Sequence, residues 1–138
     1  MTTSSGMAPL LQTYEAALAA EATAGTGQEA QICVAPWAGT LVEAYYAPEA
    51  AVTGVVTNNK AVTVRNRGAN GAGNTTMATL TFGAGTNGTA FDESALTLSG
   101  TPANVAFAPG DVITAQSTVN GTGMTLPEGK VRVVLSRS

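Results

Sequence analysis

The stretch that decides the fold lies near the end of the chain, at residues 131–135, Val-Arg-Val-Val-Leu. Successive side chains of a strand point to opposite faces, so Val131, Val133 and Leu135 would share one face. The same period of two occurs at residues 61–65, 78–82, 96–98, 105–107 and 112–114, and further β-prone runs stand at residues 32–34 and 40–46. Such alternation is typical of strands that are buried on one side.

Turn-forming residues separate these runs. Gly, Asn and Pro gather at residues 66–74 (NRGANGAGN), 83–88 (GAGTNG), 109–111 (PGD) and 120–123 (NGTG). Short strands at this spacing, with such turns between them, predict an antiparallel β-sandwich or jelly-roll-like fold. We therefore expect an all-β domain over residues 31–138.

The N-terminal part of the chain has a different composition. Residues 8–24 are rich in Ala and Glu, which favour helices. Apolar side chains recur there at four-residue spacing and would form one stripe: Leu10, Tyr14 and Leu18. The GTG at residues 25–27 would then act as a hinge. The sequence predicts a partly helical arm over residues 1–30, whose stripe contacts another subunit or packs on its own domain.

The residue counts exclude several kinds of site. Among 138 residues there is no His and only one Cys, Cys33. A Ser-His-Asp device, an imidazole metal site and a cysteine cluster are therefore impossible, and we expect no enzyme, cofactor or metal. Cys33 lies in an apolar run and should be a buried hydrophobe. No stretch approaches the roughly 20 apolar residues that cross a bilayer, and the first residues do not resemble a secretory signal. We expect synthesis in the cytoplasm and no membrane partner.

The few charges are unevenly distributed. Residues 1–50 hold five Glu and no base, while the remaining residues hold six bases and four acids, so the two parts sum to −5 and +2. Six scattered bases do not form a phosphate-binding patch, so we expect no nucleic-acid partner. Arg65, Arg67 and Arg132 could meet acidic groups of a neighbouring subunit, or could lie on a solvated sheet face.

The aromatic residues leave two functions open. Trp37 follows Pro36 between two predicted strands. It could stack a sugar ring together with Tyr46, or anchor a loop or subunit contact. The outward strand positions carry Thr and Ser more often than Lys and Glu, which favours a protein covered by its neighbours in an assembly.

Four segments carry a resemblance to a known family. They are residues 50–68 (AAVTGVVTNNKAVTVRNRG), 90–99 (AFDESALTLS), 109–117 (PGDVITAQS) and 121–129 (GTGMTLPEG). In their order and their Ala/Thr/Gly texture they resemble the head decoration proteins, which stabilise the capsids of tailed bacteriophages. The resemblance covers roughly three quarters of the chain and leaves the first 30 residues without a counterpart.

The resemblance implies a structural function. The chain would bind the major capsid protein on the outside of the assembled shell, as a homotrimer, and would be located in the virion. The residues at its contacts would include Leu10, Tyr14, Leu18, Trp37 and the three arginines Arg65, Arg67 and Arg132. The alternative is a carbohydrate-binding module or a fibre or adhesin domain with the same sandwich fold.

Overall fold

The computed structural model describes residues 10–138 as an all-β chain with one turn of helix. The strands are β1 (Leu11–Leu18), β2 (Gln28–Val34), β3 (Gly39–Pro48), β4 (Lys60–Asn66), β5 (Thr75–Thr81), β6 (Ser94–Ala95), β7 (Thr97–Leu98), β8 (Ala106–Phe107), β9 (Val112–Val119) and β10 (Gly129–Arg137). The helical turn is α1 (Pro102–Val105).

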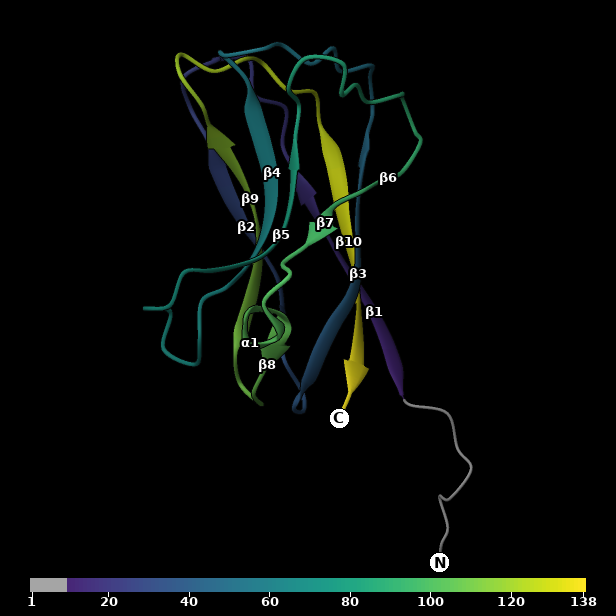
Figure 1. Cartoon of the computed structure of the whole chain (residues 1–138), viewed down its shortest axis with the longest axis vertical. Coiled ribbons are helices and arrows are strands. Elements are labelled where there is room, and N and C mark those ends of the chain that lie inside the picture. Colours follow the sequence, from purple (N-terminus) through teal and green to yellow (C-terminus); the bar gives the residue numbers. More distant parts are fainter. Residues whose placement is uncertain (1–9) are drawn as a thin grey trace, which may run out of the picture.

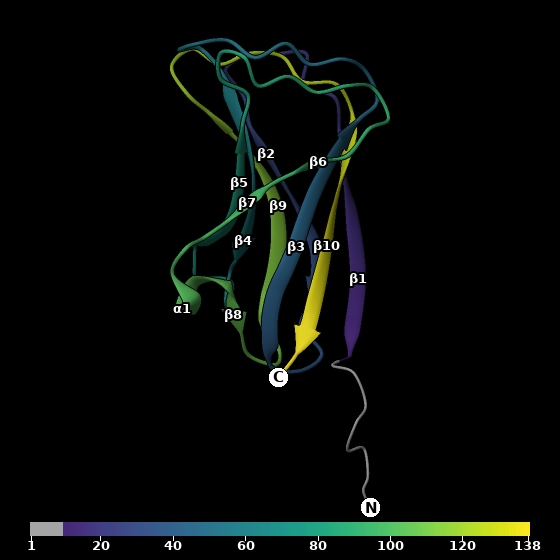
Figure 2. The same cartoon turned by 45° about the vertical axis from the view of Figure 1, so that its right-hand side comes forward.

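The strands form two antiparallel sheets that pack as a sandwich (Figure 1). The first sheet has the order β1-β10-β3-β6, and β8 also pairs with β3. The second sheet has the order β2-β9-β4-β5-β7. A turned view separates β1, β3 and β10 of one layer from β4 and β5 of the other (Figure 2). The expected antiparallel all-β fold is confirmed, and the jelly-roll assignment stays a prediction.

The core lies between the sheets, where the inward strand positions are apolar. Val131, Val133 and Leu135 of β10 are fully buried, as the alternation predicts. Val62 and Val64 of β4 are fully buried on the facing sheet. Each such side chain stabilises the fold by about 1.5–3 kcal/mol relative to an exposed position. The apolar side chains that alternate in the sequence with a period of two therefore fill the core.

The segment predicted as a helix over residues 8–24 is instead an edge strand, over the part of it that the structure describes. β1 pairs antiparallel with β10 along its whole length. The helix prediction was wrong because residues four apart lie on one face in a helix, with 3.6 residues per turn, and also in a strand, with its period of two. Tyr14 and Leu18 therefore share a face in either structure. Leu18 is buried in the core and Tyr14 packs against it. Pairing and burial outweigh the helix preference of Ala and Glu, which amounts to less than about 1 kcal/mol per residue.

Residues 19–27 cross from β1 in one sheet to β2 in the other, over the end of the sandwich that is uppermost in Figure 1. In this crossover the Glu21 carboxylate accepts hydrogen bonds from Lys60 Nζ at 2.9 Å and from the Ser117 hydroxyl at 2.6 Å. The Lys60 side chain is fully buried and that of Glu21 is 6% exposed. Lys60 shares the inward face of β4 with Val62. The ion pair therefore joins the crossover to β4 and β9 inside the sandwich.

Further hydrogen bonds fix the crossover on its other side. The Glu21 amide donates to the Leu126 carbonyl at 2.7 Å, and the Leu126 amide donates back to the Glu21 carbonyl at 3.2 Å. The Gln28 side chain accepts from the Ala19 amide at 2.9 Å and donates to the Ala19 carbonyl at 2.6 Å. The crossover is thus held by backbone and side-chain bonds to distant parts of the chain.

The predicted hinge at residues 25–27 is a tightly packed turn. Gly27 lies so close to the Ser117 carbonyl that a Cβ atom at this position would collide with it. β1 belongs to the first sheet, and the crossover, which makes an isolated bridge between Glu21 and Leu126, connects it to β2 of the second sheet. The domain boundary expected at residue 30 falls inside β2 (Gln28–Val34).

Tyr46 of β3 is buried in the core, near enough to Glu21 to feel its charge. Its ring is 1% exposed and meets Phe82 edge-on, with ring centroids 5.9 Å apart. Its hydroxyl lies 3.4 Å from the Pro127 carbonyl. Burial raises the pKa of Tyr46 to about 12, and the charge of Glu21 adds to this effect. The phenol therefore stays neutral over a range in which an unfolded tyrosine, with a pKa near 10, ionises.

Replacing Lys60 with Met should strongly destabilise the fold, because it leaves the Glu21 carboxylate buried without its cation. Breaking a buried pair in this way costs about 3–5 kcal/mol. Adding Glu21→Gln to Lys60→Met should restore most of that loss, since no buried charge remains and the amide can still accept from Ser117. Urea denaturation with an unchanged m-value measures both effects.

The matched control for this prediction is Lys130→Met. Lys130 pairs with Glu15 at 3.2 Å, but both side chains are more than half exposed. Solvent screens such a pair, so the control should change the urea midpoint little. An equally small change for Lys60→Met would show that the buried pair does not hold the fold together.

Tyr46 should make the fold sensitive to alkali. Its folded pKa of about 12 lies above its unfolded value, so stability is complete below about pH 10 and is lost as the pH rises toward about 12. The fall should reach about 2–3 kcal/mol for this group alone, at 1.36 kcal/mol per pKa unit. We expect Tyr46→Phe to remove that part of the pH dependence in urea denaturation.

Tyrosinate absorbance gives a second measure on the same samples. In the folded protein the absorbance change that Tyr46→Phe removes should occur near pH 12. If that change occurs near pH 10 while the protein is still folded, Tyr46 is not buried as described.

Candidate functional site

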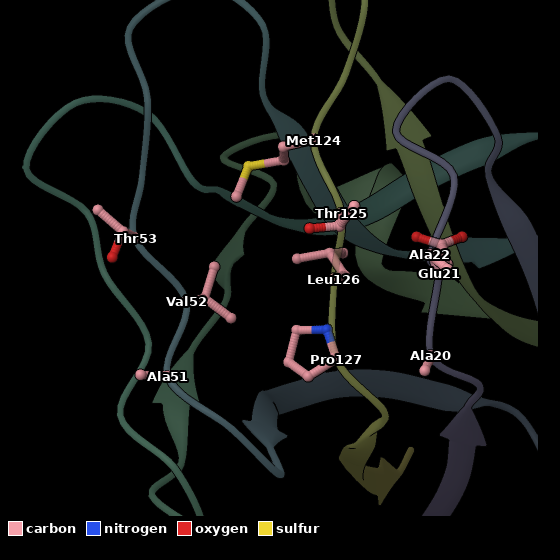
Figure 3. Close-up of a pocket in the computed structure, with 10 residues that line it drawn as sticks. All are labelled: Ala20, Glu21, Ala22, Ala51, Val52, Thr53, Met124, Thr125, Leu126 and Pro127. Atoms are coloured by element: carbon pink, nitrogen blue, oxygen red, sulfur yellow. The ribbon is translucent and has the colours of Figure 1, made fainter.

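The loop end of the sandwich carries a hollow of about 640 Å³ (Figure 3). The crossover supplies one wall and residues 51–53 the opposite wall, while residues 124–127 lie between them. Seven of its ten lining residues are apolar, among them Ala20, Ala51, Val52, Met124, Leu126 and Pro127, while the surface that the lining exposes is both apolar and polar. A concave surface of this size, with apolar and polar groups together, suits a side chain of a ligand or partner.

The walls of the hollow are fixed before anything binds. Val52 and Gly88 exchange two backbone hydrogen bonds, of 2.9 and 2.8 Å. On the other side, Leu126 is bonded to the backbone of Glu21, as described above. Val52 and Leu126 are also buried, at 3% and 5% exposed. The hollow is therefore a preformed feature of the loops and pays little ordering cost on binding.

The predicted stripe of the N-terminal segment faces its own domain. Leu18 belongs to the core and Tyr14 packs against it. Leu10, which precedes β1, is 48% exposed. Of these three residues, Leu10 alone presents a large apolar surface to solvent.

Trp37 and Tyr46 lie at opposite ends of β3. Trp37 is half-buried and packs on Phe107, with ring centroids 5.9 Å apart. Phe107 pairs with Gly39 at the start of β3, and Tyr46 lies seven residues further on, about 23 Å away along a strand. Tyr46 is in addition buried in the core. These two aromatic residues therefore do not form one platform on which a sugar ring could stack.

Two of the three predicted contact arginines lie near the end of β4. Arg67 makes a bidentate pair with Glu29, including an Nε–Oε2 distance of 2.7 Å. These bonds from Arg67 hold the pKa of Glu29 below its ordinary value, and the Thr114 hydroxyl assists at 2.6 Å. Arg65 bonds to the Asn74 side chain at 3.0 Å. Arg67 is thus engaged within its own chain.

Arg132 lies on the outer face of the first sheet. It makes a bidentate pair with Glu93, at 2.7 and 2.8 Å, and its guanidinium lies 4.6 Å from the centre of the Tyr45 ring. The hydrogen bonds from Arg132 lower the pKa of Glu93. This cluster fixes the segment before β6 onto the outside of β3 and β10.

The uneven charge along the sequence is balanced inside one molecule. Three of the five acids in residues 1–50 pair with bases from later strands or loops: Glu15 with Lys130, Glu21 with Lys60, and Glu29 with Arg67. The segment that carries the excess acid is therefore attached electrostatically to its own body.

The remaining chemistry-bearing groups form no further site in the described part of the chain. Across residues 10–138 no group of three or more acidic or Cys side chains is placed to hold a metal ion. No helix within those residues has the length and apolarity needed to cross a membrane. Cys33 is 8% exposed, and burial raises the pKa of its thiol to about 11, as expected for a buried hydrophobe.

The sequence analysis missed the hollow and the buried Glu21–Lys60 pair. Lys60 stands directly before the apolar run of β4, and its spacing of two from Val62 was the available signal for an inward position. The hollow combines three loops from distant parts of the sequence, so no local pattern could have predicted it.

No protein family and no curated protein matches this sequence. Among solved structures, a chain of the "Cyanophage Pam1 capsid asymmetric unit" is similar over 99% of this chain and 89% of its own length, with a TM-score of 0.56 and 16% identity. A chain in the structure of infectious bursal disease virus, Gx strain, is similar over 92% of this chain and 32% of its own, with a TM-score of 0.40 and 15% identity. The similarity to the bursal disease virus chain is too weak to support a conclusion. Because its identity is low, the similarity to the cyanophage chain shows a shared fold alone.

Proposed function

We propose that this chain is a structural protein of a bacteriophage capsid. It binds the outside of the assembled shell as an oligomer, a trimer in the simplest arrangement, and stabilises the contacts between major capsid subunits. Leu10 and Trp37 are candidate contacts with neighbouring subunits, because Leu10 is exposed and Trp37 is only half-buried. They precede β1 and β3, which begin at the end of the sandwich opposite the loop end that carries the hollow (Figure 1).

The observation that carries the proposal is the fold likeness to a chain of a phage capsid asymmetric unit. It extends over 99% of this chain and 89% of the other, so it is not confined to a part of either chain. A fold alone does not define a function. It agrees, however, with the decoration-protein resemblance in the order of strands and turns of the sequence.

The surface of the sandwich also suits an assembly. Within residues 10–138 the edge strand β1 pairs only with β10, and its other edge has no strand partner. β1 contains one charged residue, Glu15, and that residue is paired with Lys130. Free monomers usually protect such an edge with unpaired charges or proline. An edge of this kind is better suited to a position beside other subunits.

The proposed mechanism is mechanical. A protein that binds the assembled lattice and not the free subunits stabilises the lattice by mass action. An oligomer that contacts several shell subunits at once gains affinity through its effective concentration. In this mechanism the chain itself needs no reacting group.

Co-sedimentation with capsid shells tests this function. The shells come from the phage that encodes the chain, prepared with and without expansion and lacking the chain itself. We expect the purified protein to sediment with expanded shells at micromolar concentration, to saturate, and to raise the temperature at which the shells disassemble. Isolated capsid subunits are the control and should not retain it.

The same co-sedimentation experiment can also contradict the proposed capsid function. No co-sedimentation at about 10 μM, which corresponds to a binding free energy weaker than about −7 kcal/mol, would rule out the proposed function. Sedimentation equilibrium of the free protein measures the oligomeric state separately.

A further inference from the structure

The rim of the hollow carries carboxylates that have no basic partner among the described residues. The Glu49 amide donates to the Glu128 carbonyl at 2.7 Å, so these two exposed residues are neighbours. Glu49 precedes Ala51 of one wall by two residues, and Glu128 directly follows Pro127 of another. Within residues 10–138, no Lys or Arg forms an ion pair with either of them. The apolar hollow is thus bordered by free negative charge.

An exposed aromatic side chain stands next to this rim. Phe91 is 79% exposed, and its amide donates to the Pro48 carbonyl at 2.7 Å, directly before Glu49. Its backbone has a φ of 60°, which a bulky residue rarely adopts. Asp92, which follows it, is exposed as well and forms no ion pair within residues 10–138. An exposed aromatic ring and exposed carboxylates therefore occur together at this end of the molecule.

Charge complementarity selects the kind of partner. The chain's own bases are largely committed: four of the six pair with acids of the same molecule. A second copy would also bring a net charge of −3 toward a rim that is already negative. Like charges at an interface disfavour association, whereas Lys or Arg would be attracted. The partner is therefore a different protein, with bases beside an apolar side chain.

We propose that the hollow docks a short segment of another protein, in which one medium-sized apolar side chain enters between Ala51 and Leu126 while flanking Lys or Arg side chains meet Glu49 and Glu128. This inference rests on the proposed function insofar as the segment belongs to a shell subunit. Fixed walls lower the entropic cost of docking, and the charged rim orients the segment.

Capped pentapeptides probe the surface without any shell. Gly-Lys-Leu-Lys-Gly should shift the amide NMR signals of residues 20–22, 51–53 and 124–126. Gly-Glu-Leu-Glu-Gly, which reverses the charge, and Gly-Lys-Ser-Lys-Gly, which removes the apolar group, should shift them much less. The absence of shifts at these amides up to about 10 mM of the first peptide, or equal shifts with all three, would overturn the proposal.

Variants separate the hollow from its rim. Ala51→Trp places a large ring in the hollow and should abolish the peptide shifts. Glu49→Gln combined with Glu128→Gln should weaken binding by about threefold to tenfold at low salt, as expected for two exposed charge pairs, and by less at high salt. The matched controls are Ala69→Trp, in the exposed loop at the other end of the sandwich, and Glu43→Gln on the outer face of β3; both should bind like wild type.

Shell binding then identifies the source of the segment. Wild type and Ala69→Trp should sediment with expanded shells, and Ala51→Trp should not. If wild type itself fails to sediment, the proposed capsid function is wrong. If wild type and Ala51→Trp sediment equally, the capsid function stands and the docking role of the hollow is wrong.

Discussion

The buried ion pair between Glu21 and Lys60 is the interaction on which the arrangement of this molecule depends. It lies inside the sandwich and joins the crossover to the middle of the second sheet, while the Glu21 backbone bonds to Leu126. Removing one buried charge costs far more than the pair contributes against an apolar replacement. We therefore expect the pair to contribute more to the choice of one arrangement than to the stability of the fold. In that arrangement the crossover leads from β1 in the first sheet to β2 in the second, and the hollow lies between the loops.

The distribution of charge follows from the same arrangement. Three of the six bases, Lys60, Arg67 and Lys130, pair with acids of the acidic first third of the chain, and Arg132 pairs with Glu93, so few bases are without an acidic partner in their own chain. Glu49 and Glu128, which form no ion pair within residues 10–138, adjoin residues that line the hollow or its wall, and the exposed Phe91 and Asp92 follow next to Pro48. One end of the sandwich is therefore distinct in chemistry from its faces, which suits a protein that has to present one end to a partner.

Most strands could be predicted from the sequence because burial on one side leaves a period of two, as in β4 and β10. β1 could not be predicted in this way. Tyr14 and Leu18 are four residues apart, which places them on one face in a helix and in a strand alike, and the Ala and Glu residues around them favour the helix. Arg67 and Arg132 were expected to meet acidic groups of a neighbouring subunit or to lie on a solvated sheet face; within their own chain they pair with Glu29 and Glu93, and contacts with other subunits stay a prediction. The hollow was beyond prediction because its walls come from residues 20–22, 51–53 and 124–127, which only the folded chain brings together.

Amide hydrogen exchange of the free, native protein tests most directly whether β1 and the crossover are locked into the sandwich. The amides of β1 that bond to β10, and the Glu21 amide that bonds to Leu126, should exchange almost as slowly as those of β9 and β10, because they open only when the whole domain unfolds. If the β1 and Glu21 amides exchange at the rate of an unstructured chain while β9 and β10 are still protected, β1 and the crossover are not held in the sandwich. The N-terminal segment would then be a separate arm.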